Sequence, residues 1–342
     1  SVGLGTGALA NDDGSANKNT AVGTNALYTN TTGYWNTASG YKALYANTTG
    51  DRNTATGHSA LLSNTSGGAN TASGYTALKT NTSGARNTAS GYTALMNNTT
   101  GNDNTATGSY ALRANTTGAQ NTAHGRGSLQ SNSTGGLNTA NGYYSLFSNT
   151  TGYSNTASGY KALFSNTTAS NNTASGMYAL RANTTGASNS AIGYKALNYN
   201  TSGYRNTATG WHSLTANTTG ISNTASGGYS LKSNTTGQYS TANGYDALKR
   251  NTTGTKNIGL GYGAGDMITT GANNTIIGDY AGTAALADTV VIAAGTTERL
   301  KIDASGLTIN GSALALGATN INGLSDGYAV TTSVGLGTGA LT

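Results

Sequence analysis

The stretch NTASGYKALYANTTGDR, from Asn36 to Arg52, decides the fold because it returns along the chain at a fixed spacing of 17 residues. Consecutive copies follow one another with no insertion or deletion. A short fixed period predicts a solenoid, since each unit can bury its apolar side only against its neighbours. The sixteen copies open at Asn19, Asn36, Asn53, Asn70, Asn87, Asn104, Asn121, Asn138, Asn155, Asn172, Asn189, Asn206, Asn223, Ser240, Asn257 and Asn274.

Residue types are fixed by position in this unit, which we number 1–17 from its opening residue. Position 3 is Ala in nearly every copy, position 5 is Gly, position 8 is Ala or Ser, and position 9 is Leu from Leu27 to Leu248. Gly and Asn recur too often for a helix, and the apolar positions lack a 3.6-residue spacing. We predict an all-β chain with two β segments in each coil, at positions 2–4 and 6–10, and a turn at N-T-T-G (Asn47–Gly50).

Stacked coils of this kind form a parallel β-solenoid, or β-roll, with a thin interior. Parallel pairing at roughly 4.8 Å would make sixteen coils a rod on the order of 75–80 Å long. One Leu and two Ala in each coil bury little apolar area for the chain that must be ordered. We therefore expect a homo-oligomer, most simply an intertwined or side-by-side homotrimer. The residues expected in the structural core are Ala38, Gly40, Ala43, Leu44, Leu61, Leu78, Leu95, Leu146, Leu163 and Leu248.

The composition limits the classes of protein that remain. Only 35% of the residues are hydrophobic and 8% are charged, but 21 Tyr and the absence of Pro distinguish the chain from a disordered segment. The chain has no Cys, which excludes disulfides and thiolate sites. The net charge is +6, and the Lys and Arg residues at positions 7, 10 and 17 are spread over many coils. A nucleic-acid site needs clustered cations, so we expect no nucleic-acid partner. No apolar run approaches the roughly 20 residues of a membrane span, so we expect none.

Catalytic and metal-binding patterns are not found. The three histidines, His58, His124 and His212, have no recurrent carboxylate partner, and the acidic residues are dispersed. The glycine-rich phrase Gly259–Gly265 precedes no predicted helix, so it is not a nucleotide-binding loop. We expect no catalytic, metal or cofactor site.

Asn-x-Thr/Ser sequences occur in almost every copy, for example at Asn30, Asn47, Asn64 and Asn81. Such sequences can accept glycans in secreted eukaryotic proteins. We interpret them instead as turns whose Asn and Thr side chains stack into ladders on successive coils.

Position 6 is often aromatic and is the candidate surface-binding stripe. Aromatic rings at this position could bind a sugar or a receptor, or could pack along a subunit seam and shield the roll. His58, Ser109, Arg126, Met177 and Gly228 interrupt the pattern. The stripe comprises Tyr41, Tyr75, Tyr92, Tyr160, Tyr194, Trp211 and Tyr245, with Tyr143 and Tyr262 at the same position.

Three segments carry a resemblance to a known family. SVGLGTGALA (1–10), NIGLGYGAGD (257–266) and NTIIGDYAG (274–282) resemble the head repeats of trimeric autotransporter adhesins of the YadA type. The unit NTASGYxALxxNTTG is similar to repeats in bacteriophage tail-fibre proteins. The resemblance covers roughly residues 1–295 and implies a left-handed parallel β-roll, three chains to a head, and an extracellular location on a virion tail or a bacterial surface. The unit departs from the adhesin heads in its longer period, its NTTG phrase and its Thr or Ser in place of Val or Ile.

The predicted organisation follows the period. Residues 1–18 form an opening roll turn, 19–295 the β-roll, 296–316 a β-hairpin, 317–332 a connector and 333–342 the start of a further roll turn. SVGLGTGAL at 333–341 repeats residues 1–9 identically. Either the chain is one block of a tandem fibre, or this phrase is simply a favoured opening for a roll.

These features predict a structural fibre or shaft protein that holds a binding tip at a distance. The alternative is an adhesin whose repeat surface binds host glycan or matrix. Ice binding is a remote third possibility, because it requires Thr-x-Thr facing outward in coil after coil, whereas this unit reads Thr-Ala-Ser/Thr and has its other threonines in the turn. We expect no enzymatic activity.

Overall fold

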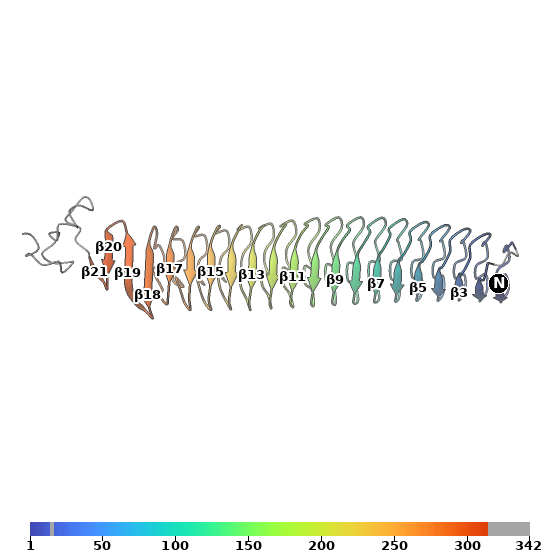
Figure 1. The fold of residues 1–342 in the computed structure, drawn as a ribbon, viewed down its shortest axis with the longest axis horizontal. Coiled ribbons are helices and arrows are strands. Elements are labelled where there is room, and N and C mark those ends of the chain that lie inside the picture. The colour runs from blue at the N-terminus through green and yellow to red at the C-terminus, as the bar shows by residue number, and fades with distance from the viewer. Residues whose placement is uncertain (14–16, 314–342) are drawn as a thin grey trace, which may run out of the picture.

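The computed structural model describes residues 1–13 and 17–313, and over these residues it contains strands and turns but no helix. All the strands belong to one sheet that runs the length of a rod (Figure 1). The predicted all-β parallel solenoid is therefore confirmed. The strands are β1 (Val2–Leu4), β2 (Thr20–Val22), β3 (Thr37–Ser39), β4 (Thr54–Thr56), β5 (Thr71–Ser73), β6 (Thr88–Ser90), β7 (Thr105–Thr107), β8 (Thr122–His124), β9 (Thr139–Asn141), β10 (Thr156–Ser158), β11 (Thr173–Ser175), β12 (Ser190–Ile192), β13 (Thr207–Thr209), β14 (Thr224–Ser226), β15 (Thr241–Asn243), β16 (Ile258–Leu260), β17 (Thr275–Ile277), β18 (Val290–Ala294), β19 (Thr297–Asp303), β20 (Gly306–Ile309) and β21 (Ser312–Ala313).

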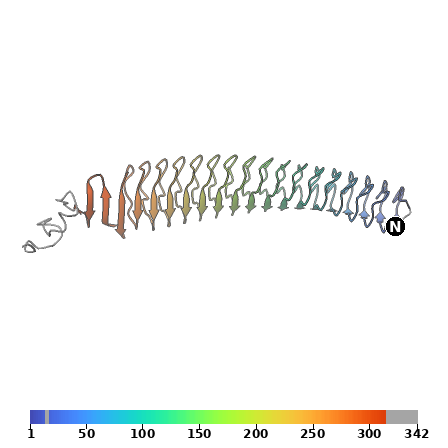
Figure 2. The same ribbon diagram turned by 45° about the horizontal axis from the view of Figure 1, so that its top comes forward.

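The strand register reproduces the sequence period. From β2 to β17 each strand pairs in parallel with the strand 17 residues later, as in Thr37 with Thr54. The spacing is 18 residues at the start, where Val2 pairs with Thr20, and 15 at the end, where Thr275 pairs with Val290. The rod also curves gently along its length (Figure 2).

The second β segment predicted at positions 6–10 is wrong. Positions 5–11 form turns, because the residues at positions 7 and 9 adopt left-handed backbone conformations, with φ of 54° at Lys42 and 52° at Leu44. A strand cannot continue through residues of this kind. The amides still bond between coils: the Lys42 N–H donates to the Thr24 carbonyl, and the Leu44 N–H donates to the Ala60 carbonyl, each at 3.0 Å. The amides of positions 7 and 9 thus bond to opposite neighbouring coils, while the Ala43 N–H between them donates to the Gly40 carbonyl of its own coil.

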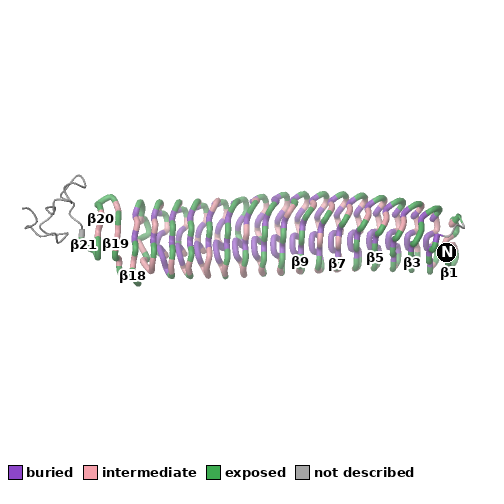
Figure 3. The backbone as a smooth tube through the Cα atoms, viewed as in Figure 1, coloured by how far each residue is buried: buried purple, intermediate pink, exposed green. Residues whose placement is uncertain are grey.

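The apolar interior consists of Ala at positions 3 and 8 and Leu at position 9. In the unit that opens at Asn36, Ala38, Ala43 and Leu44 are fully buried, and the same positions form a continuous buried line along the rod (Figure 3). Gly40 lies only half-buried, at the turn after the strand. Its φ is +136°, and a Cβ there would lie 2.5 Å from the Gly57 carbonyl oxygen. Glycine at position 5 therefore permits close stacking of coils and does not fill the interior. The other residues predicted for the core, Leu61, Leu78, Leu95, Leu146, Leu163 and Leu248, are all fully buried.

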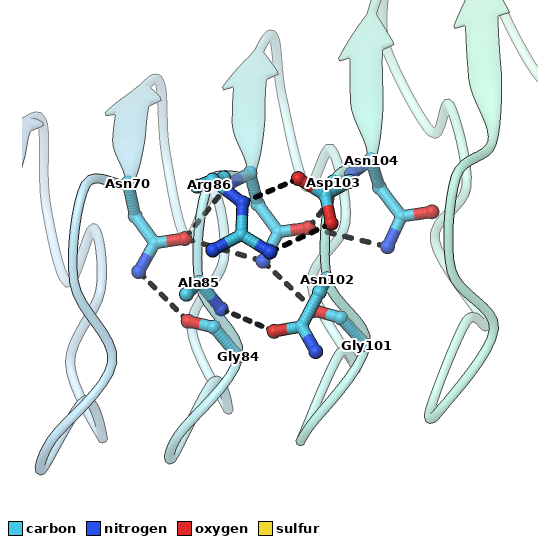
Figure 4. A network of polar contacts seen from close by, with 9 residues as sticks. Asn70, Gly84, Ala85, Arg86, Gly101, Asn102, Asp103 and Asn104 are labelled. Atoms are coloured by element: carbon cyan, nitrogen blue, oxygen red, sulfur yellow. Dashed lines mark hydrogen bonds and ion pairs between the residues drawn. The ribbon is translucent and has the colours of Figure 1, made fainter.

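Two buried asparagine ladders run beside this apolar line. Asn47, at position 12, donates from Nδ2 to Asn30 Oδ1 at 2.7 Å and to the Gly50 carbonyl at 2.9 Å. Asn36, at position 1, donates to the same Gly50 carbonyl at 2.9 Å and accepts at Oδ1 from the Asn53 N–H. Figure 4 shows the position-1 ladder from Asn70 to Asn104, with the Gly84 and Gly101 carbonyls as acceptors. These bonds satisfy side chains that would otherwise be costly to bury.

The ladders confirm the structural interpretation of the Asn-Thr-Thr sequences. Asn47 is fully buried, and the nitrogen that would carry a glycan already donates two hydrogen bonds. The following Thr48 hydroxyl donates to the Thr65 carbonyl of the next coil at 3.1 Å. A folded coil therefore leaves no accessible acceptor nitrogen at position 12.

Antiparallel strands end the described part of the rod. β18 pairs with β19, β19 with β20, and β20 with β21. The predicted hairpin corresponds to β19 and β20, and the antiparallel arrangement extends to strands on both sides of it. Residues 314–316 of that hairpin, the connector 317–332 and the copied phrase at 333–342 lie outside the described residues.

Candidate functional site

The outer face of the sheet is lined by the side chains of positions 2 and 4. In β3 the exposed Thr37 and Ser39 flank the buried Ala38, because alternate side chains of a strand point to opposite faces. Positions 2 and 4 both point outward because the residue between them points inward, so outward Thr-x-Thr does occur, in β4, β7 and β13. The other strands lack Thr at one or both positions, and the requirement for Thr-x-Thr in coil after coil is met only in part. Position 2 is Thr in every strand from β2 to β15 except at Ser190.

The same face becomes apolar at both ends of the rod. At the amino-terminal end Val2, Leu4 and Val22 are exposed on it. At the other end the pairing register aligns two exposed or half-buried apolar columns. Such a contiguous exposed patch is typical of an interaction surface. The columns are Ile258, Val290, Ile302 and Leu307 at position 2 and its equivalents, with Thr275 between Ile258 and Val290, and Leu260, Ile277, Ile292, Leu300 and Ile309 at position 4 and its equivalents.

The predicted aromatic stripe forms a file of rings along another edge of the roll. Tyr75 and Tyr92 stack with ring centroids 5.3 Å apart and an interplanar angle of 8°. His58, one of the apparent interruptions, stacks on Tyr75 at 5.2 Å and contacts Tyr41 at 5.0 Å. Among the stripe residues, Tyr41, Tyr75, Tyr92, Tyr160, Trp211 and Tyr245 are exposed and Tyr194 is half-buried.

Position 7 supplies a ring in several coils where position 6 does not, although Arg126 is followed by Gly127 and Thr24 by Asn25. Tyr110, Tyr178 and Tyr229 follow Ser109, Met177 and Gly228 directly in the chain. They contact the preceding ring of the file, at 5.4 Å for Tyr92 with Tyr110, 5.4 Å for Tyr160 with Tyr178 and 4.9 Å for Trp211 with Tyr229. Positions 6 and 7 considered together would have revealed this complementary pattern.

Basic side chains accompany the rings. Lys161 lies over Tyr160 with its Nζ 5.3 Å from the ring centroid, and Arg126 lies over Tyr143 at 5.8 Å. From Asn104 to Tyr245 the sequence contains no Asp or Glu. The basic side chains, although dispersed along the sequence, therefore lie along the same edge of the roll as the aromatic rings. The basic residues of this stretch are Arg113, Arg126, Lys161, Arg181, Lys195, Arg205 and Lys232, and all but Arg205, which stands at position 17, occupy positions 6, 7 or 10.

This edge does not offer a stacking platform for nucleic-acid bases, because neighbouring rings such as Tyr75 and Tyr92 cover each other's faces. The expectation of no nucleic-acid partner now depends on this stacking, since the dispersal of cations no longer supports it. It stays a prediction.

The histidines remain apart from one another. His124 is exposed on the sheet face, next to Thr107 and Asn141 in the register. His212 lies in the aromatic file, and burial lowers its pKa, with Lys195 and Lys232 lowering it further. Within residues 1–13 and 17–313 no three His, Asp or Glu side chains are grouped as metal ligands.

Two hollows open on the basic edge, each between successive coils. One encloses about 330 Å³ and is lined by Asn97, Arg113, Ala114, Gln130 and Ser131. The other encloses about 240 Å³ and is lined by Tyr178, Arg181, Lys195, Asn198 and Tyr199. No contact joins Tyr178 to Tyr194, so the second hollow coincides with a break in the ring file.

No protein-family model matches the chain, and no curated protein sequence matches it either. A search of the described residues for a helix long and apolar enough to cross a membrane finds none.

Proposed function

We propose that the chain is a structural shaft of an extracellular fibre, either a phage tail fibre or a bacterial surface filament, that holds a binding tip at a distance. The observation that carries the proposal is the unbroken 17-residue register from β2 to β17, with the same Ala, Leu and Asn side chains buried in each coil. Such uniformity suits a spacer, because every coil contacts only its neighbours and length is set by coil number. The resemblance to tail-fibre and adhesin-head repeats supports the same function and location.

The shaft is a homotrimer in this proposal, with the outer sheet faces of the three chains meeting around a common axis. The apolar columns at the two ends of that face support it, because like ends of parallel copies would cover Val2 and Leu4 at one end and Leu260 and Ile277 at the other. The hydroxyl-lined centre would be covered between these two apolar contacts. Burial of these columns would supply apolar area that a single thin roll lacks.

Negative-stain microscopy tests the proposed shaft, and light scattering tests the proposed homotrimer. We expect thin uniform rods and a mass three times that of one chain. The variant Leu260→Glu with Ile277→Glu should dissociate the trimer, while Lys256→Glu, a matched charge change away from the face, should not. A monomer at all concentrations would exclude the trimer, and a short head on a stalk would favour the adhesin.

Two alternatives remain open to test. The adhesin is supported by the exposed aromatic and basic edge, which repeats along the rod. Ice binding gains an observation of its own, because Thr54 and Thr56 both face outward on a regular parallel sheet and Thr recurs at position 2 along it. A thermal-hysteresis measurement decides this alternative, since an ice-binding face must lower the freezing point at micromolar concentration. Absence of hysteresis would remove it.

A further inference from the structure

The hollow between the coils that open at Asn172 and Asn189 is created by two departures from the repeat. Asn198 is the only Asn at position 10 of the array, where the preceding coil carries the longer Arg181 and the following coil carries Thr215. Tyr199 is the only aromatic residue at position 11, where most coils carry Ala, Ser or Thr. A short side chain therefore opens the space and a large ring extends its wall. Both changes occur together in one coil.

Two uncompensated cations line this hollow. Arg181 and Lys195 form no ion pair with any described residue. The nearest acidic residues in the sequence are Asp246, three coils after Lys195, and Asp103, five coils before Arg181. The guanidinium of Arg181 lies over Tyr178 at 5.5 Å, which fixes the side chain at the hollow. The lowered pKa of His212 has Lys195 as one of its causes, in agreement with a positive local potential. The hollow therefore favours an anionic group.

One residue that lines the hollow, Asn198, has a buried side-chain oxygen without a hydrogen-bond partner. Asn198 is only 3% exposed, and its Oδ1 accepts no hydrogen bond. Buried polar atoms are nearly always paired, so an unpaired one at a cavity wall indicates a missing donor. A hydroxyl group would supply that donor.

The remaining wall of the hollow is the exposed ring of Tyr199. Tyr199 is 54% exposed and, unlike the rings of the stacked file, contacts no other described ring. A free ring face can accept the C–H groups of a sugar, which are apolar on one side of the pyranose. Only a single free ring is present, so successive bases of a nucleic acid would find no second platform.

We propose that this hollow binds one unit of an acidic polysaccharide, with the sugar carboxylate at Arg181 and Lys195, a sugar hydroxyl donating to Asn198 Oδ1 and the sugar ring on Tyr199. The combination of cations, an unpaired amide oxygen and a free ring matches the three parts of a uronic acid. The site lies on the side of the shaft and does not depend on the trimer or on a binding tip, so its test is independent of the proposed function.

The other hollow gives an internal contrast. It has one cation, Arg113, whose Nε has no partner, but Gly127 stands at the position equivalent to Lys195, Gln130 at that equivalent to Asn198, and no ring lines the wall. The same chemistry predicts weaker binding of an acidic sugar there. Arg113→Gln is therefore a variant that should leave the main site unchanged.

Isothermal titration with oligogalacturonate tests the proposal on the full chain. We expect binding to the wild type, and an affinity about ten- to a hundredfold lower for Lys195→Gln, because a hydrogen bond to a charged group contributes about 1.5–3 kcal/mol. Lys161→Gln is the matched control, since Lys161 also stands at position 7 over a tyrosine but lines neither of the two hollows described above. Tyr199→Ala should weaken binding, and the melting temperature of each variant reports on folding.

Three results would overturn the proposal. The first is equal affinity of the wild type and Lys195→Gln, both folded. The second is equal affinity for oligogalacturonate and its carboxyl-reduced form, which keeps the hydroxyls and loses the charge. The third is tighter, Lys195-dependent binding of a short oligothymidylate, which would assign the hollow to nucleic acid.

Discussion

Left-handed backbone at position 9 is the residue-scale feature that repeats most strictly. Leu44 has a φ of 52° and Leu146 one of 50°. This conformation costs an L-residue with a side chain roughly 1–2 kcal/mol. It persists because the turn directs the leucine into the interior, where it is fully buried. The buried side chain stabilises a backbone that the residue does not favour.

Leu146→Ala tests this balance. The variant loses the buried side chain but keeps the left-handed backbone, so we expect the free energy of unfolding to fall by about 2–5 kcal/mol in urea titration. Lys161→Ala, one coil later on the surface, should change it by less than about 1 kcal/mol. Equal losses in the two variants would contradict the inward placement of position 9.

Position 17 offers a stabilising change. Leu137 has a φ of 61° and is 57% exposed, so its side chain has little to gain from this backbone conformation. Asn171 and Asn273 occupy the same position in other copies, and Asn tolerates left-handed backbone best among non-glycine residues. Leu137→Asn should raise the free energy of unfolding by about 1 kcal/mol. Leu137→Ala is the control and should not reproduce the gain.

The buried apolar positions could be predicted residue by residue, because invariant Ala and Leu at fixed positions of a short repeat have no other place to be buried. The burial of Asn36 was not predictable in the same way. Asn at a turn usually faces water, and only the coil spacing shows that its amide reaches the Gly50 carbonyl and the next coil. Gly40 was assigned to the interior for its invariance, whereas its actual role is close approach to Gly57.

At the scale of elements, the predicted second strand failed for a specific reason. The phrase Y-x-A-L (41–44) alternates like a strand, but its second and fourth residues are left-handed. The sequence did contain one indication against a strand at this position. Gly127 and Gly263 stand at position 7, and glycine is unfavourable in the interior of a strand. The file of aromatic rings was likewise only partly predictable from the sequence, because its members stand at position 6 in some coils and at position 7 in others.

The turn between β19 and β20 should respond to acid. Asp303 accepts hydrogen bonds from the Ser305 hydroxyl and N–H and pairs with Lys301, and these contacts lower its pKa to about 2. Its unfolded value is about 3.9, so the carboxylate stabilises the turn above about pH 4 and loses this effect as the pH falls towards 2. Amide exchange in β20, corrected for its intrinsic pH dependence, should accelerate over that range. Asp303→Asn should remove the pH dependence; if it persists, another group is responsible.

At the scale of the whole molecule, the rod is a one-dimensional stack. Each strand from β2 to β17 pairs only with the strand before and the strand after it, and the asparagine ladders likewise join neighbouring coils. Stability should then be a sum of coil and interface contributions. A coil in the middle has no unique partner elsewhere in the described rod. The contribution of such a coil to stability therefore depends more on its register with the neighbouring coils than on its place along the chain.

This property predicts that a whole coil can be removed. Deletion of residues 87–103 joins Arg86 to Asn104, so every remaining residue keeps its unit position and the buried Asn and Leu lines stay continuous. We expect a rod shorter by about 4.8 Å with a nearly unchanged melting temperature, measured by small-angle scattering and circular dichroism. Deletion of residues 87–95 alone is the control. It leaves residues 96–103 with a turn but no strand, so their buried Asn98 loses its place in the ladder and the melting temperature should fall. If the whole-coil deletion lowered the melting temperature as much as the half-coil deletion, the coils would not be equivalent, and stability would depend on contacts beyond nearest neighbours.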